Sequence, residues 1–258
     1  MNYENILVEY ENSVATIILN RPNVMNALNS QMRAELTDAV TRYSKEARVL
    51  VLTGSGNAFC SGQDLGDGNS LQSVDLERTL RDEYEPLIRA IVNSTVPTVT
   101  ALNGAAAGAG ANLALAADIV IAKSSAYFVQ AFSRIGLIPD VGGTYFLPRA
   151  MGLAKAIGSS IFADKIMAAE AHEIGLIYEY VEDDNYDIHI KSRVEYLANG
   201  PTVAFAGIKT AMRKSLNNSL DEQLELEAKL QKKCGNTRDF QEGVLAFHEK
   251  RDAKFEGR

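Results

Sequence analysis

Two glycine-containing turns and one aspartate supply the residues of this chain that could perform chemistry. The longer stretch, Asn103–Asp118, has the sequence NGAAAGAGANLALAAD and follows the apolar, β-prone run Val96–Leu102. A strand leading into a glycine turn and then a small-residue helix exposes backbone N–H groups, which favour negative charge. The stretch has no ionisable side chain before Asp118. We therefore expect backbone donors to stabilise any charge that develops there.

This turn does not fit a dinucleotide-binding fingerprint. Gly108 and Gly110 begin the G-x-G-x-x-G pattern, but Leu113 stands where the third small residue belongs. An acidic residue is also missing at the ribose-binding distance of roughly 20 residues. The alternative is purely structural: the small residues permit close packing of the helix against a strand.

The second turn lies in Ala58–Leu65, with the sequence AFCSGQDL. A turn here could direct the backbone N–H of Gln63 into a cleft, although an ordinary surface turn is the alternative. One N–H from each turn would make an oxyanion hole, the arrangement that stabilises negative charge on a carbonyl oxygen. The sequence alone leaves open whether the two turns converge.

Asp140 is a lone carboxylate among apolar residues, namely Ile135, Leu137, Ile138, Pro139 and Val141. Burial would favour its neutral form and raise its pKa into the range of a useful general base. The alternative is an N-cap for a helix that follows Gly142-Gly143-Thr144, a position that suits aspartate.

Composition restricts the functions that fit. The chain has 258 residues and a net charge of −7, which disfavours nucleic acid as a partner. Its two cysteines and three histidines show no metal-ligand or disulfide spacing, so we expect no metal and a reducing compartment. We recognise no signal peptide and no run of transmembrane length. We therefore expect a cytoplasmic protein with no membrane association.

The elements that must position these residues alternate between strand and helix. We expect a helix over Val74–Asn93, with Pro86 as a kink or boundary, a mobile loop over Gly66–Leu71, and mainly helix from Leu153 onward. Alternation followed by a helical tail predicts an α/β core with an α-helical C-terminal region. The expected strands are Ile6–Glu11, Val14–Leu19, Val49–Thr53, Pro97–Leu102, Asp118–Ala122 and Tyr127–Val129, and a further helix covers Ser30–Ser44.

Taken in order, these pieces resemble the crotonase (enoyl-CoA hydratase/isomerase) superfamily along nearly the whole chain. The resemblance implies a spiral of ββα units over residues 1–200, a helical trimerisation region over 201–258, and acyl-CoA thioester substrates. It also implies trimers or dimers of trimers, and no cofactor apart from the coenzyme A of the substrate. The matching segments include Arg21-Pro22, Asn26-Ala27-Leu28, Ala58–Leu65, Asn103–Asp118, Gly142-Gly143-Thr144, Leu147-Pro148-Arg149, Ala168–Gly175, Glu242-Gly243 and Ala246-Phe247.

The resemblance also implies roles for individual residues. Gln63 and Ala109 would supply the two oxyanion-hole N–H groups, and Phe247 and Lys250 would reach the coenzyme A of a neighbouring subunit. The other positions implied to contact substrate are Asn26, Ala27, Ser61, Gly62, Asp64, Leu65, Gly108, Gly110 and Phe132.

Departures from the hydratase pattern favour a different reaction. Asn112 and Phe132 stand where related hydratases carry two catalytic glutamates, and an amide and a phenyl ring cannot manage both protons of a hydration. The run Ala131–Asp140, AFSRIGLIPD, is similar to the phenylacetate-pathway isomerase branch. That branch converts a ring epoxide of phenylacetyl-CoA to an oxepin and shifts double bonds in enoyl-CoAs. One carboxylate, Asp140, suffices for such a shift.

Three alternatives stay open at this point. One is a hydratase of low activity that uses Asp140 alone, and another is a nucleophilic aspartate, as in related benzoyl-CoA dehalogenases. The third is a non-catalytic acyl-CoA-binding protein. The sequence leaves open whether the acyl group is aromatic or aliphatic, and we expect the loop Gly66–Arg81 to shape its pocket.

Overall fold

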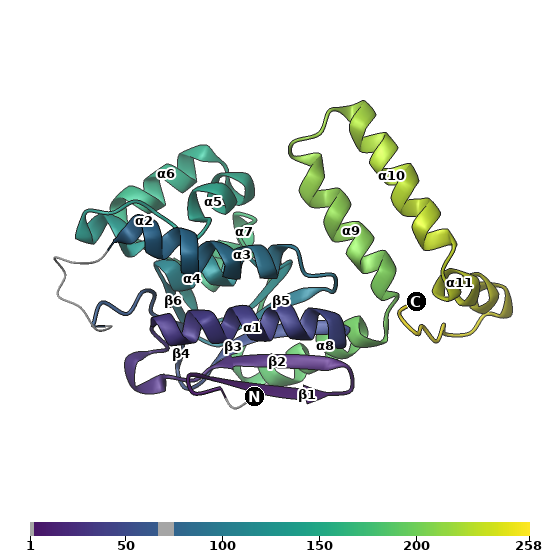
Figure 1. Ribbon diagram of the computed structural model, residues 1–258, viewed down its shortest axis with the longest axis horizontal. Helices are drawn as coiled ribbons and strands as arrows, with labels where there is room; N and C mark the ends of the chain where they lie inside the picture. Colours follow the sequence, from purple (N-terminus) through teal and green to yellow (C-terminus); the bar gives the residue numbers. More distant parts are fainter. Residues whose placement is uncertain (1–2, 67–74) are drawn as a thin grey trace.

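The computed structural model describes residues 3–66 and 75–258, whose strands form two sheets (Figure 1). The larger sheet has six strands, of which the β1–β2 hairpin is antiparallel and the remaining pairs are parallel. Its strand order is β1 (Ile6–Glu11), β2 (Val14–Leu19), β3 (Val49–Gly54), β5 (Thr98–Leu102), β7 (Ile119–Lys123) and β10 (Glu179–Val181).

The second sheet has four short strands, in the order β4 (Ala58–Cys60), β6 (Ala105–Ala107), β8 (Tyr127–Val129) and β9 (Lys165–Met167). Three times in succession the chain places one strand in the large sheet and the next in the small one: β3 then β4, β5 then β6, β7 then β8. This alternation is the expected spiral of ββα units, and the predicted α/β class with a helical C-terminal region is confirmed.

Helices cover both faces of the large sheet because its central strands are apolar on both sides. Leu50 and Leu52 of β3 belong to the core shared with α1 (Ser30–Glu46), whereas Val49 and Val51 pack toward α8 (Tyr186–Asn199). The remaining helical segments are η1 (Pro22–Val24), α2 (Leu76–Thr79), η3 (Leu80–Tyr84), α3 (Glu85–Val92), α4 (Ala109–Leu115), η4 (Ala131–Ile135), α5 (Gly143–Met151), α6 (Leu153–Phe162), α7 (Ala168–Glu173) and η5 (Asp183–Asn185).

The chain ends in three helices, α9 (Thr202–Ser215), α10 (Leu220–Gly235) and α11 (Arg238–Glu249), which stand apart from the two-sheet body (Figure 1). Two cations of α9 connect it to that body. Lys209 Nζ lies 2.7 Å and Arg213 Nη2 lies 2.9 Å from the carboxylate of Asp118, next to the start of β7. Within the described residues, no helix is long and apolar enough to cross a membrane.

The structure corrects three sequence-based expectations. The strand before the glycine turn is β6, which lies between Asn103 and Gly108, and not the Val96–Leu102 run. The region after Leu153 contains the strands β9 and β10 in addition to the expected helices. Its sequence does not reveal them, because strands of three residues are too short to show a period of two. The helix expected over Val74–Asn93 spans Leu76–Val92.

That helix also departs from regular α-geometry. A π turn, η3, covers Leu80–Tyr84, and Pro86 follows in the first turn of α3, as expected for a residue that lacks a backbone N–H. Of the expected loop Gly66–Leu71, residues 67–71 lie outside the described residues, as does Val74.

Candidate active site

The two glycine turns converge. They follow β4 and β6, which are neighbouring parallel strands, so both turns leave the small sheet at the same edge. A methyl group placed on Gly62 would lie 2.9 Å from the carbonyl oxygen of Ala107 and 3.5 Å from the amide nitrogen of Ala109. Only glycine tolerates this approach together with the positive φ of 101° at position 62.

Each turn presents a backbone N–H for which residues 3–66 and 75–258 supply no acceptor. The amides of Leu28 and Asp64 are used by the isolated bridge around Gln63, and that of Gly108 donates to the Val129 carbonyl at 2.9 Å. In the described part of the chain, the amides of Gln63 and Ala109 have no such partner. Two free donors on adjoining turns are the arrangement that an oxyanion hole needs.

Buried side chains hold the Gln63 turn in place. The hydroxyl of Tyr84 donates to Gln63 Oε1, and Arg33 Nη1 donates to the same oxygen at 3.0 Å. Arg33 also donates to the carbonyl of Leu28 at 2.7 Å and pairs with Glu83 at 2.6 Å. Burial raises the pKa of Tyr84 above its usual value, so its hydroxyl stays protonated and able to donate.

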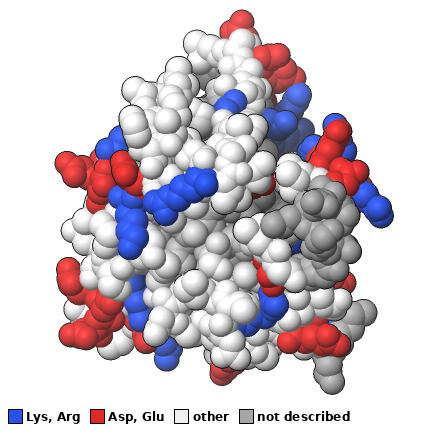
Figure 2. Space-filling view, turned by 90° about the vertical axis from the view of Figure 1, so that its left-hand side faces the viewer, with Lys and Arg blue, Asp and Glu red and all other residues white. Residues whose placement is uncertain are grey.

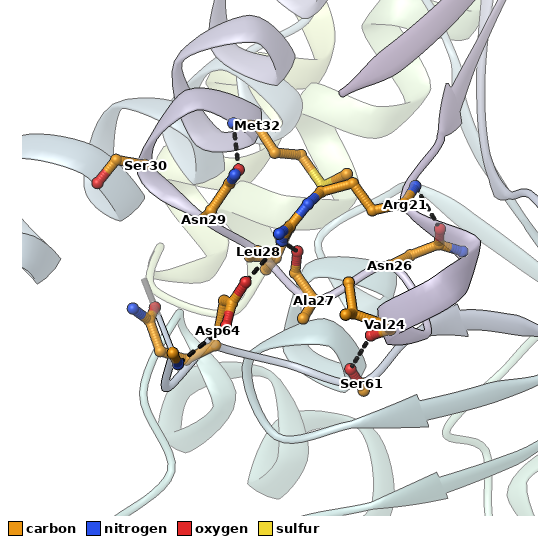
Figure 3. A network of polar contacts seen from close by, with 12 residues as sticks. Arg21, Val24, Asn26, Ala27, Leu28, Asn29, Ser30, Met32, Ser61 and Asp64 are labelled. Carbon is orange, nitrogen blue, oxygen red and sulfur yellow. Dashed lines mark hydrogen bonds and ion pairs between the residues drawn. The ribbon is translucent and has the colours of Figure 1, made fainter. Parts of the chain in front are cut away.

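A second polar network, centred on Arg21, supports the segment Ser61–Asp64 (Figure 3). Arg21 Nη1 lies 2.7 Å from both the Asp64 carboxylate and the Ala27 carbonyl, and its hydrogen bond holds the pKa of Asp64 below its usual range. Asn26 Oδ1 accepts from the amide of Arg21 at 2.9 Å, and Ser61 Oγ donates to the Val24 carbonyl at 3.1 Å. The side chains of Asn26, Ser61 and Asp64 are thus engaged within the protein, and their amides donate to the carbonyls of Arg21, Met25 and Leu28, so these residues support the turn.

Asp140 lines a cavity of about 520 Å³ between the Leu76–Val92 helix and the chain that leads into α5. Leu80, Tyr84 and Ile88 form one wall, and Pro139 and Phe146 belong to the opposite wall. Its Oδ1 atom is buried without a hydrogen-bond partner, and burial raises the pKa of this carboxyl to about 6. The N-cap alternative is wrong, because Gly142 occupies the N-cap of α5 and no side chain caps that helix.

The backbone of Asp140 is fixed even though its carboxylate is unpartnered. Its carbonyl oxygen accepts from Gly143 N at 2.7 Å and from Asn112 Nδ2 at 2.8 Å. Asn112 is fully buried, and its Oδ1 accepts from Gln130 Nε2 at 2.9 Å. Both polar atoms of Asn112 are therefore engaged within the protein.

The close-packing explanation of the small residues also holds. A methyl group on Gly110 would lie 2.6 Å from the Cys60 carbonyl, so α4 contacts the end of β4 directly. A methyl group on Gly108 would lie 3.7 Å from the ring of Phe132, which is buried beside the turn. Cys60 is buried too, and desolvation raises the pKa of its thiol to about 12, which disfavours a reactive thiolate.

The remaining predicted contacts lie elsewhere. Leu65 is 58% and Phe247 is 81% exposed, and Lys250 ends α11 at the surface. Phe247 lines a separate cavity of about 420 Å³ formed by α9, α10, α11 and the C-terminal segment. This chain does not bring Phe247 or Lys250 to the cavity beside Asp140.

Sequence reasoning missed Arg33, Tyr84 and Gln130. Arg33 stands in an amphipathic helix where a solvated cation is the ordinary expectation, yet its side chain is only 2% exposed. Tyr84 and Gln130 belong to no recognisable motif, and their roles arise only from tertiary contacts. Among residues 3–66 and 75–258, no group of three or more His, Cys, Asp and Glu side chains is placed to hold a metal ion.

The chain belongs to the enoyl-CoA hydratase/isomerase family, whose family model matches residues 9–258. Its fold is the crotonase fold. A crystal structure of enoyl-CoA hydratase from Bacillus anthracis superposes with a TM-score of 0.91 at 30% identity, covering 99% of this chain and 100% of that one.

Two curated relatives carry different activities in their names. A "probable enoyl-CoA hydratase" of Rhodobacter capsulatus is 56% identical over 258 residues, covering 100% of both chains. The 1,2-epoxyphenylacetyl-CoA isomerase of Escherichia coli strain K12 is 42% identical over 260 residues, covering 99% of both chains. Family membership indicates an enzyme acting on acyl-CoA, with hydration and isomerisation both represented among its relatives.

Proposed function

We propose that this chain is an acyl-CoA isomerase in which Asp140 is the single acid/base and the N–H groups of Gln63 and Ala109 form the oxyanion hole. The observation that carries the proposal is the buried, unpartnered Oδ1 of Asp140 in an apolar cavity. A carboxylate in such surroundings gains from accepting a proton, and a pKa of about 6 suits proton transfer in both directions near neutral pH.

A double-bond shift requires only one acid/base group and one oxyanion hole. Asp140 removes a proton from C2 of a 3-enoyl thioester, and the electron pair moves into a dienolate whose charge rests on the thioester oxygen. The two backbone donors stabilise that charge as it develops. Asp140, now protonated, returns the proton at C4 to give the 2-enoyl thioester, and the ring of Phe132 limits the access of water.

The same site also suits rearrangement of the ring epoxide of phenylacetyl-CoA to an oxepin. The name of the Escherichia coli relative and the run Ala131–Asp140 support this substrate. The cavity wall of Leu80, Ile88 and Phe146 is apolar and accommodates either a ring or an aliphatic chain.

We further propose that the thioester is held by the amides of Gln63 and Ala109, with coenzyme A as part of the substrate and no other cofactor. Phe247 and Lys250 would complete the site of a neighbouring copy in a homotrimer or a dimer of trimers.

Figure 2 faces the side of the molecule that carries α6, where a broad area lacks charged side chains. Exposed apolar residues of α6 include Leu153, Ile157, Ile161 and Phe162.

Hydration is the second candidate, favoured by the name of the Rhodobacter capsulatus relative. Asn112 argues against an efficient hydratase. Its side-chain amide is hydrogen-bonded to the Asp140 carbonyl and to Gln130, so it is not free to orient water.

A substrate panel tests the proposal. Initial rates are measured with a ring-epoxide, a 3-enoyl and a 2-enoyl thioester, for the unmodified enzyme and for Asp140→Asn. We expect turnover of the epoxide or the 3-enoyl thioester, faster than hydration of the 2-enoyl thioester, and its loss in the variant. If hydration of the 2-enoyl thioester were the fastest reaction, the chain would be a hydratase and the proposed isomerase function would be wrong. If the thioesters bound without turnover, the chain would be a non-catalytic acyl-CoA-binding protein.

A further inference from the structure

The carboxylate of Asp140 has no side-chain partner, so its position depends on the backbone that carries it. The carbonyl of that residue is held by Asn112 Nδ2 at 2.8 Å and by Gly143 N at 2.7 Å. Asn112 is 0% exposed, and it is oriented in turn by Gln130 Nε2, which donates to its Oδ1 at 2.9 Å. Asn112 therefore connects α4 to the Asp140 carbonyl.

The place of Asn112 on α4 adds to this role. Ala109, whose amide is one proposed oxyanion donor, is the first residue of the same helix. Residues three apart on a helix lie about 4.5 Å apart along its axis, a distance fixed by the geometry of one turn. One rigid helical turn therefore holds an oxyanion donor at one end and the support of the base at the other.

An amide is the chemical group that this position requires. Asn112 donates to a carbonyl with one atom and accepts from Gln130 with the other. A carboxylate could accept from Gln130, but it would repel the Asp140 carbonyl. The space is also restricted: a methyl group on Gly143 would lie 2.3 Å from Asn112 Nδ2 and 2.7 Å from its Cγ. A longer acidic side chain would have to displace the segment that carries Asp140.

We propose that Asn112, oriented by Gln130, is a positioning residue that sets Asp140 at a fixed distance from the oxyanion hole. This inference rests on the proposed function, because it needs Asp140 to be the acid/base. It also gives a physical reason for asparagine at a position where related hydratases carry a glutamate: the position supports the base instead of acting on water.

The test compares Asn112→Asp with a matched control. Asn112→Asp keeps the shape but removes the donor to Asp140 and adds a neighbouring negative charge. We expect kcat to fall about 10- to 100-fold with KM changed less than about threefold, and the acid limb of the rate profile to move to higher pH. The charged and titratable groups that share the cavity with Asp140 are Arg81, Tyr84, Glu85, Arg89 and Tyr145, none of which the substitution alters.

Asn103→Asp is the control for a merely structural effect. Asn103 Nδ2 also donates to backbone carbonyls, those of Gly56 at 3.0 Å and Ala58 at 3.3 Å, but it makes no contact with the Asp140 segment. We expect this variant to lose thermal stability and keep the acid limb of the pH profile. An equal shift of that limb in both variants would overturn the inference.

A double-mutant cycle separates this inference from the proposed function. If Asn112 acts through Asp140, Asn112→Asp in an Asp140→Asn background should cause less than about a threefold further loss, because the group it positions is already absent. Additive losses would overturn the positioning role and leave Asp140 as the base. Full activity of Asp140→Asn alone would instead overturn the proposed function.

Gln130→Met, a milder change, should lower kcat about 2- to 10-fold, and unchanged kcat in this variant would contradict the role of Gln130.

Discussion

The amide nitrogen of Ala109 lies 3.5 Å from the point that a methyl group on Gly62 would occupy. Gly62→Ala should therefore displace the turn that carries the Gln63 N–H, since the new methyl would also lie 2.9 Å from the Ala107 carbonyl. Loss of one oxyanion donor lowers kcat about 100- to 1,000-fold. We expect a fall of that order with coenzyme A affinity retained, measured by steady-state kinetics and equilibrium binding.

Gly152→Ala is the control for backbone strain. Gly152 has a φ of 77° and no atom within 4 Å of an added methyl group. With a ψ of 159° this backbone lies in a region that is essentially restricted to glycine, so the variant should lose about 1 to 3 kcal/mol of stability and keep its kcat. If Gly62→Ala retained full turnover, the two turns would not form the oxyanion hole.

Asp140→Asn should reduce isomerase turnover about 100- to 10,000-fold, because it keeps the shape and removes the base. In the unmodified enzyme the pKa of Asp140 is raised to about 6, so kcat/KM should rise with pH through that value as the base ionises. A profile flat between pH 5 and 8 would argue against Asp140 as the base. The rate is measured in buffers of constant ionic strength.

Ionisation of Asp140, which should raise kcat/KM, should lower the stability of the folded protein. Its pKa is higher in the folded protein, about 6, than the ordinary 3.8, so folding favours the protonated form. The contribution of the raised pKa to the free energy of unfolding is fully present below pH 3.8. It is lost as pH rises through about 6, so the protein is about 2 to 3 kcal/mol less stable above that pH than it is at low pH because of this group. Asp140→Asn should thus be more stable than the unmodified protein at pH 7.5, with the difference vanishing near pH 4. Urea unfolding at both pH values measures it, and equal stability at pH 7.5 would contradict burial of the charge.

The sequence predicted those parts of the molecule whose local pattern agrees with their final environment. Ile6–Glu11, Val14–Leu19 and Tyr127–Val129 are strands with the expected bounds, because apolar residues recur at every second position or in a short β-prone run. The sequence left open whether Asp140 is buried. Its Oδ1 is buried at the cavity, although its chain neighbours Ile135, Leu137 and Ile138 are exposed.

What the sequence could not predict depends on contacts between distant segments. The π turn over Leu80–Tyr84 and the strand β6 leave no periodic pattern, and the engagement of Asn112 by the Asp140 carbonyl joins residues 28 positions apart. Convergence of the two turns required the pairing of β4 with β6, which sequence spacing does not encode.

Tyr84→Phe should lower kcat about 3- to 10-fold, because it removes a hydroxyl that donates to Gln63 Oε1 and leaves only Arg33 on that oxygen. Stability should fall by about 1 kcal/mol, the net contribution of one hydrogen bond. Tyr186→Phe is the matched control, since Tyr186 is equally buried and its hydroxyl has no partner. It should keep kcat and lose no stability. Equal kinetic effects in the two variants would show that Tyr84 does not support the oxyanion turn.

Asp118→Asn should loosen the contact between α9 and the two-sheet body. The Asp118 carboxylate is 11% exposed and faces Lys209 Nζ at 2.7 Å and Arg213 Nη2 at 2.9 Å. Burial lowers the pKa of Lys209, whereas its interaction with Asp118 favours the charged form. Removing one member of a buried pair leaves an uncompensated charge and costs about 3 to 5 kcal/mol. The free energy of unfolding in urea and the rate of proteolysis within residues 202–258 are the measurements.

Asp82→Asn provides the comparison, because Asp82 pairs with Arg78 at 3.4 Å at the surface, where both side chains are more than 60% exposed. Exposed pairs of this kind contribute little, since water and salt screen them. We expect this variant to match the unmodified protein in both measurements. If Asp118→Asn behaved in the same way, the ion pairs of Lys209 and Arg213 would not be what secures α9.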